Sequence, residues 1–165
     1  SVHLSIYYAG KLLVIGQVDS PSSFNYSVTT GSTFDLLETS SGRVILAFQT
    51  VEERRRRLER RKLFMKLQKK KNNLPSSLLE KKFSSKIIHE IIKNKCEVVK
   101  SLQVNGVTNI SVPVFDHTNQ AIAAVTIPFL QRIKKDSLND ISLVSTTKIL
   151  KDQALTLSKS LGFQS

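Results

Sequence analysis

The chain has 165 residues, of which 40% are hydrophobic and 23% are charged. This length and composition predict a single globular domain over residues 1–165 with a core of its own, rather than a disordered chain. The longest nearly unbroken apolar run, residues 121–130, is too short to cross a bilayer. The lone Cys96 has no partner for an internal disulfide, so we expect a reducing, cytoplasmic location. We expect no membrane attachment, because the basic segment also has too few apolar residues for a strongly amphipathic helix.

The net charge of +12 is concentrated in one segment. Residues 51–71 hold 11 Lys and Arg and 3 Glu, which gives that segment a net charge of +8 and leaves +4 for the remaining residues. This distribution predicts one basic surface rather than a domain that is basic throughout.

The start of the chain predicts three strands. Residues 4–8 and 12–18 have strand-like patterns, and residues 9–11 between them suit a hairpin turn. A loop rich in Ser and Pro follows, and residues 24–30 alternate aromatic and small side chains, which predicts the third strand.

Three helices are predicted next. Residues 39–41 offer N-cap side chains to a short helix over 42–48. A second helix is predicted over 51–70, because glutamates stand at its start and lysines at its end, as the helix dipole favours. Residues 72–75 break it. A third helix, over 84–95, carries four isoleucines at helical spacing.

The second half of the chain returns to strands, predicted over 98–104, 107–115 and 121–129. The polar residues 116–120 join the last two strands as a hairpin loop. This order of strands, helices and strands, with hairpin connections, predicts an antiparallel sheet with helices packed on it, an α+β domain.

A long final helix is predicted from a cap at Asp136 to Leu161, with Gly162 as its stop. Its buried stripe is expected to consist of Leu143, Thr147, Leu150, Ala154, Leu157 and Leu161.

Three blocks of residues, taken in order, resemble a known family. Residues 4–18 form an opening hairpin, and residues 39–48 join a small-residue loop to an apolar helix that ends Leu-Ala-Phe. Residues 106–129 form a hairpin that contains Pro-Val-Phe-Asp at 113–116. Together they resemble the C-terminal effector-binding domain of IclR-type transcriptional regulators. The resemblance implies a GAF-like fold, a curved antiparallel sheet of about six strands with helices packed on its faces.

The resemblance also implies a function. The domain would bind a small-molecule effector, such as an organic acid, and would act as a homodimer or homotetramer. DNA would be bound only through an N-terminal winged helix-turn-helix domain that is absent from this chain. We expect no enzyme, cofactor or metal site, because the sequence shows no paired carboxylates, nucleophile motif or set of metal ligands.

The effector site implied by the resemblance combines a loop and the sheet. The loop begins a helix, where backbone N–H groups lack partners and the dipole favours a carboxylate, although the same groups could serve only as a cap. The candidate ligand-binding residues are Ser40, Ser41 and Gly42 in the loop, and Val99, Asn109, Ser111, Thr126 and Pro128 in the sheet.

Strand alternation supports part of this site independently. Asn109 and Ser111 fall on one face of their strand, opposite the apolar face that carries Ile110. They could also be the solvated side of a half-exposed strand. Val99 stands where the family usually has an acidic residue, and Pro128 stands where it often has Ser, which makes the implied pocket less polar.

The basic helix offers an alternative function, binding of nucleic acid through contacts to several phosphates. The candidate residues are Arg54, Arg55, Arg56, Arg57, Arg60 and Arg61. Phe64 is the only aromatic residue in the segment, so bases would find few stacking partners. A solvated helix face explains the same pattern.

Overall fold

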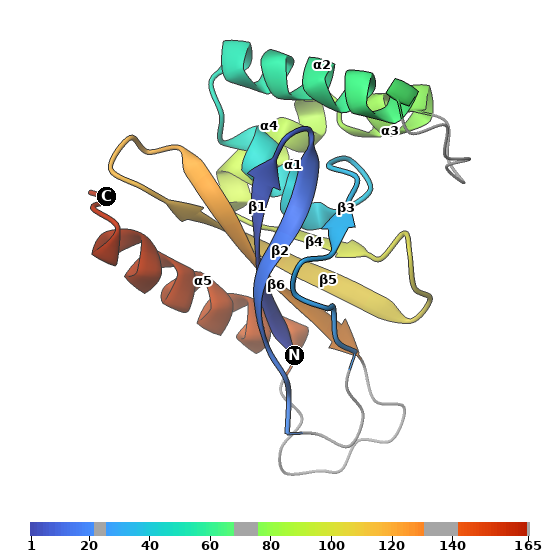
Figure 1. The fold of residues 1–165 in the computed structure, drawn as a ribbon. Coiled ribbons are helices and arrows are strands. Elements are labelled where there is room, and N and C mark those ends of the chain that lie inside the picture. The colour runs from blue at the N-terminus through green and yellow to red at the C-terminus, as the bar shows by residue number, and fades with distance from the viewer. Residues whose placement is uncertain (22–25, 68–75, 131–141, 165) are drawn as a thin grey trace.

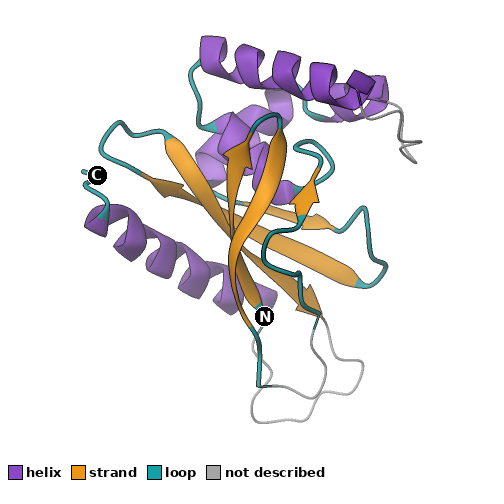
Figure 2. Ribbon diagram, viewed as in Figure 1, coloured by secondary structure: helices purple, strands orange, loops and turns teal. Residues whose placement is uncertain are grey.

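The computed structural model of the protein describes residues 1–21, 26–67, 76–130 and 142–164. These residues form one curled, six-stranded antiparallel sheet with the strand order β3-β2-β1-β6-β5-β4 (Figures 1 and 2). The strands are β1 Val2–Tyr8, β2 Lys11–Val18, β3 Thr33–Phe34, β4 Glu97–Lys100, β5 Val107–Phe115 and β6 Ala121–Leu130. The predicted GAF-like α+β fold is confirmed.

Helices lie on both faces of this sheet (Figure 1). The described helices are α1 Ser40–Ala47, α2 Val51–Leu67, α3 Ser76–Lys82, α4 Ser85–Asn94 and α5 Leu143–Ser160. Helix α1 packs against β5 and β6 and contacts α4, and α2 and α3 lie beyond them at the top of the molecule. Helix α5 packs along β5 on the opposite face.

Each face of the sheet has its own apolar core. Val44 of α1 belongs to the core on one face, together with Ala124 of β6. Ile110 of β5 belongs to the core on the other face, where Leu150 of α5 covers it. The predicted alternation along β5 is therefore confirmed, because Ser111 points to α1 while its neighbour Ile110 points to α5.

The prediction of a third strand over 24–30 was wrong for the residues that can be judged. Residues 22–25 lie outside the described part of the chain, and residues 26–30 form no strand. The chain reaches β2 only after a turn at Gly31, which has a φ of +90° and whose N–H donates to Val14 O at 2.8 Å. Pairing therefore starts later, at Thr33–Phe34.

Strand β4 is shorter than the predicted 98–104, because a serine ends it. The hydroxyl of Ser101 accepts hydrogen bonds from the backbone N–H groups of Gln103 and Val104, both at 3.2 Å. These local hydrogen bonds turn the backbone and take the place of the hydrogen bonds that a longer strand would make to its neighbour.

The last helix keeps the predicted stripe only in part. Leu150 and Ala154 are buried as predicted, but Leu157 and Leu161 are 38% and 42% exposed. Ser158 is buried in their place, and its hydroxyl accepts from a backbone N–H at the end of β5. Residues spaced four apart shift by about 40° around a helix at each step. The row formed by Leu150, Ala154 and Ser158 therefore winds slowly around α5, and this row is the one that lies against the sheet.

The segment around α3 was missed, and two predictions cannot be judged. Helix α3 has few apolar residues, but Leu79 is only 1% exposed and belongs to the core beside α1. The end of the predicted second helix, residues 68–70, and the cap at Asp136 lie outside the described residues. The described part of α5 is capped by Ser142, whose hydroxyl accepts from Ser145 N.

The turn between β1 and β2 is pressed against α2. Gly10 has a φ of +89°, and a Cβ atom there would lie 3.0 Å from the carbonyl oxygen of Arg60 and 3.2 Å from the nitrogen of Arg61. The ammonium group of Lys11 lies 4.1 Å from the centre of the Phe64 ring, which adds a cation–π contact. Glycine is needed here for its conformation and for the close approach.

We therefore expect Gly10→Ala to lower the free energy of unfolding by about 1–2 kcal/mol, because it adds left-handed strain and crowds α2. Gly16→Ala is the matched control, since a Cβ atom at Gly16 meets no atom within 4 Å. Urea denaturation of both variants measures the difference. Equal stability of the two variants would contradict the close packing of the turn.

Candidate functional site

Four buried hydroxyl groups link the start of α1 to the sheet. Ser40 Oγ lies 2.7 Å from Ser111 Oγ, which lies 2.7 Å from Thr126 Oγ1, which in turn lies 2.8 Å from Ser41 Oγ. Ser111 and Thr126 face each other across β5 and β6, and no residue of this hydroxyl chain is more than 2% exposed. The sequence predicted all four as site residues, and the structure brings them into direct contact.

Gly42 permits α1 to begin where it does. A Cβ atom at this position would lie 2.1 Å from the carbonyl oxygen of Leu36, so any larger residue would push the helix away from the preceding loop. The hydroxyl of Thr39 caps the helix by accepting from Gly42 N at 3.2 Å. The predicted cap is therefore confirmed, and it uses one of the N–H groups that the ligand hypothesis had assigned to an effector.

A buried ion pair fixes α1 beside the hydroxyl chain. Arg43 donates from Nε to both carboxylate oxygens of Glu97 at 2.9 and 3.0 Å, and from Nη1 to Leu37 O at 2.6 Å. Burial raises the pKa of the Glu97 carboxyl, and the guanidinium of Arg43 counteracts this shift. Glu97 pairs with Ser111 across the strands, so the ion pair borders the site directly.

Glu97 was not identified from the sequence as a residue beside the site, although its position in the strand pattern indicated it. Glu97 stands two residues before Val99, the position where the family has an acidic residue, and alternation puts both on the same face of β4. An acidic side chain is thus present on this face, but Arg43 neutralises it.

The remaining predicted residues form a second row on the same face. Val99 pairs with Asn109 and Asn109 pairs with Pro128 across three neighbouring strands. Pro128 is buried, whereas Val99 and Asn109 are half-buried. These two side chains are therefore the most accessible members of the predicted set.

Strand β1 adds two polar residues that the sequence did not suggest. His3 pairs with Thr126, and Ser5 pairs with Ala124. Within the described part of the chain, His3 Nδ1 and Ser5 Oγ are buried without a hydrogen-bond partner. Burial, followed by the positive amino group of Ser1, lowers the pKa of His3 to about 4, so its imidazole is neutral at pH 7.

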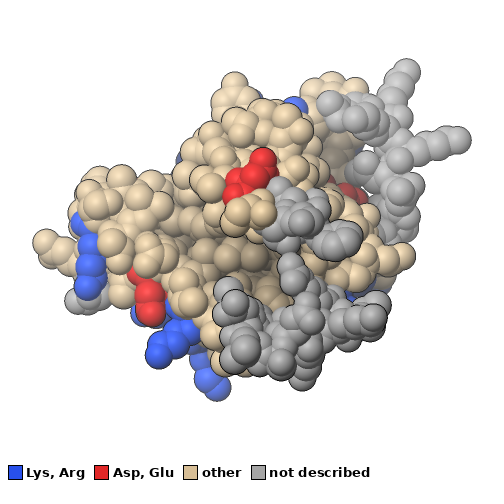
Figure 3. Space-filling view, turned by 90° about the horizontal axis from the view of Figure 1, so that it is seen from below, with Lys and Arg blue, Asp and Glu red and all other residues tan. Residues whose placement is uncertain are grey.

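The molecule is hollowed on the side that these strands reach. The start of β1 and the end of β6 both run to the lower side of the molecule (Figure 1). Seen from below, the surface has a central hollow whose visible floor shows no charged side chain (Figure 3).

Neither a metal site nor a membrane span is found among the described residues. Within them, no group of three or more His, Cys, Asp and Glu is arranged to hold a metal ion. None of their helices is long and apolar enough to cross a membrane.

The arginines of α2 have structural roles that the nucleic-acid hypothesis did not foresee. Arg54 donates to the carbonyl oxygens of residues 46, 47 and 49, and so caps the end of α1. Arg61 is 1% exposed and donates to Asp35 at 2.8 Å, immediately before the loop that leads into α1. Both side chains therefore serve contacts within the fold, so the interpretation of α2 as a purely solvated face is incomplete, while phosphate binding by α2 stays a prediction.

The other four candidate arginines remain nearer the surface. Arg55 pairs with Glu59, while Arg56 and Arg57 share the carboxylate of Glu53. The side chain of Arg60 has no hydrogen bond or ion pair within the described part of the chain.

The fold is that of a GAF-like α+β domain. Residues 1–159 match the family described as "Bacterial transcriptional regulator IclR C-terminal", and the chain belongs to this family. No curated protein matches the chain.

Solved structures show the same fold at low sequence identity. The repressor BlcR from Agobacterium tumefaciens is 18% identical, with a TM-score of 0.69 over 99% of this chain and 60% of its own. The IclR protein of Thermotoga maritima is 24% identical, with a TM-score of 0.67 over 98% of this chain and 61% of its own. The C-terminal domain of E. coli KdgR is 20% identical, with a TM-score of 0.68 over 98% of this chain and 87% of its own. The chain thus spans about 60% of the first two proteins.

We expect Ser111→Ala to lower the free energy of unfolding by about 2 kcal/mol, because it leaves the buried hydroxyl of Ser40 without a partner and breaks the link to Thr126. Ser5→Ala is the control, since it removes an equally buried hydroxyl that has no partner in the described chain, and should cost less than about 0.5 kcal/mol. Urea unfolding separates the two. Equal losses would mean that the hydroxyl chain adds no stability.

Proposed function

We propose that this domain binds a small organic molecule with acceptor oxygens, such as an organic acid, at the hydroxyl chain and the row beside it. The observation that supports this most is the hydroxyl chain itself. Four hydroxyls from one helix and two strands converge beside a helix start, on the face that carries Asn109 and Val99. The same hydroxyls fix the position of α1 on the sheet, so a ligand that bonds to them acts on the placement of this helix.

The effector would act by competing for these hydroxyls. In the described conformation they satisfy one another, so an incoming carboxylate or carbonyl has to replace at least one bond, for example the bond between Ser40 and Ser111. The half-buried side chains of Val99 and Asn109 mark the side from which a ligand can approach. Binding then favours a second position of α1 relative to β5 and β6, which is a population shift.

Contacts between α1 and α2 could transmit a movement of α1 to the rest of the domain. Arg54 holds the end of α1 to α2, and Arg61 of α2 holds Asp35 ahead of the start of α1. A displacement of α1 would therefore change contacts of α2. In the whole protein, we propose that this change alters DNA binding by a separate winged helix-turn-helix domain. Self-association as a homodimer or homotetramer and a cytoplasmic location stay predictions.

A thermal-shift screen with organic acids, aromatic acids and sugars tests the binding proposal, since a ligand that binds only the folded state raises the unfolding temperature by mass action. We expect at least one saturable stabiliser whose affinity falls at least tenfold in Asn109→Leu, because that change removes the accessible amide beside the hydroxyl chain.

Asn105→Leu is the matched control, because it makes the same substitution at an exposed position outside the site. A hit that both variants weaken alike would place the ligand elsewhere. The absence of any stabiliser among carboxylates and carbonyl compounds would contradict the proposed ligand class.

A further inference from the structure

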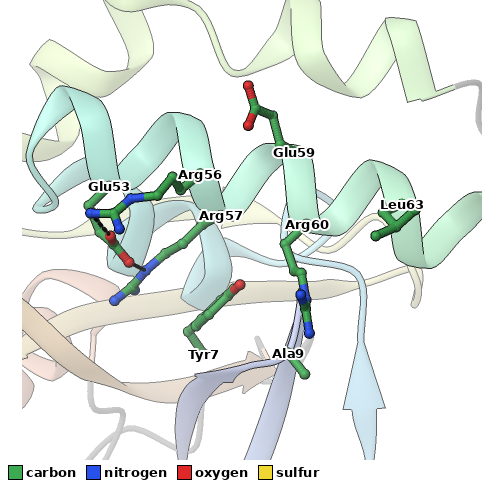
Figure 4. A pocket seen from close by; sticks show the side chains of 8 residues that line it. All are labelled: Tyr7, Ala9, Glu53, Arg56, Arg57, Glu59, Arg60 and Leu63. Atoms are coloured by element: carbon green, nitrogen blue, oxygen red, sulfur yellow. Dashed lines mark hydrogen bonds and ion pairs between the residues drawn. The ribbon is translucent and has the colours of Figure 1, made fainter.

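A second cleft lies far from the hydroxyl chain, between α2 and the hairpin of β1 and β2 (Figure 4). Tyr7 and Ala9 form its hairpin side. Its α2 side is formed by Glu53, Arg56, Arg57, Glu59, Arg60 and Leu63. These helix positions are three or four residues apart, so they share one face of α2. Nothing in the effector-binding proposal uses this cleft.

The cleft is held open by contacts on both sides. Gly10 packs against the backbone of α2, as described above, and fixes the distance between the hairpin and the helix. The guanidinium of Arg57 lies 4.5 Å from the centre of the Tyr7 ring and donates to Glu53 at 2.9 Å. One arginine and the tyrosine ring are therefore already oriented before any ligand arrives.

Positive charge on the cleft face exceeds negative charge. Arg56 and Arg57 share the single carboxylate of Glu53, so one negative charge offsets two positive charges. Glu59 pairs with Arg55, and its carboxylate points away from the hairpin (Figure 4). The side chain of Arg60 points down beside Ala9 and has no ion pair in the described part of the chain.

We propose that this cleft binds a small dianion, a phosphate group or a dicarboxylate, between Arg57 and Arg60 with Arg56 at the rim. Guanidinium groups recognise such oxygens by paired N–H donors in a planar fork, and Arg57, whose side chain is 17% exposed, is partly shielded from water. Tyr7 lines the same space and directs its hydroxyl toward α2, which supplies a further donor (Figure 4). The lining holds three arginines and two glutamates, and Glu59 points away from the hairpin, so three positive charges and one negative charge remain beside the cleft, which favours a dianion over a monoanion.

The chain offers closely matched variants for a test. Arg60→Gln removes one charge from the cleft without breaking an ion pair in the described residues, so the fold should persist. Lys66→Gln removes one charge from an exposed position of the same helix, outside the cleft. Thermal unfolding of both variants confirms that each is folded.

The 15N-labelled protein is titrated with inorganic phosphate and, separately, with malonate, at an ionic strength held constant with sodium chloride. We expect saturable chemical-shift changes of the backbone amides in residues 7–10 and 56–63 with at least one of the two dianions. Binding of phosphate or of malonate then shows whether the cleft prefers a phosphate group or a dicarboxylate. Arg60→Gln should weaken the affinity about five- to tenfold and Lys66→Gln less than twofold.

Shifts that do not saturate with either dianion, or equal weakening by the two variants, would overturn the proposal. Binding at this cleft is judged only from the amides of residues 7–10 and 56–63, which lie outside the hydroxyl chain, so failure here leaves the effector-binding proposal untouched.

Discussion

The hydrogen bonds between Ser40, Ser111, Thr126 and Ser41 determine where α1 lies on the sheet. Hydrophobic contacts alone are not directional, so they could hold α1 in several registers, whereas hydroxyl groups bond only within a narrow range of distance and angle. The close approach at Gly42 and the ion pair of Arg43 depend on the same placement. Polar residues thus specify the position of a helix that apolar residues stabilise.

The same arrangement makes α1 a suitable switch element. Ser40 and Ser41 keep their hydrogen bonds to the sheet only while the helix stays in place, and each buried hydroxyl that loses its partner costs about 1–3 kcal/mol. A ligand that supplies replacement oxygens removes this cost for a second position of the helix. The energy difference between the two positions can then be small enough for a modest affinity to change their populations.

The fold was largely predictable from the sequence, whereas the roles of charged residues were not. Alternation and spacing identified the strands around Ser111 and the helix after Thr39, because local patterns reflect which face is buried. The run of arginines in α2 was ambiguous, because a sequence shows charge but not its partner. Arg54 and Arg61 contact residues outside α2, and only the tertiary structure brings them together. The polar positions of β1 were missed for the same reason, since their importance depends on strand β6 beside them.

A double-mutant cycle between Ser40→Ala and Ser111→Ala tests most directly whether the hydroxyl chain fastens α1 to the sheet. The free energy of unfolding is measured by urea denaturation for the wild type, both single variants and the double variant. If the two hydroxyls interact as described, the coupling energy should be about 1 kcal/mol, with the second substitution costing less than it does alone. Additive losses, with a coupling energy near zero, would show that α1 is held by its apolar contacts and would contradict the switch.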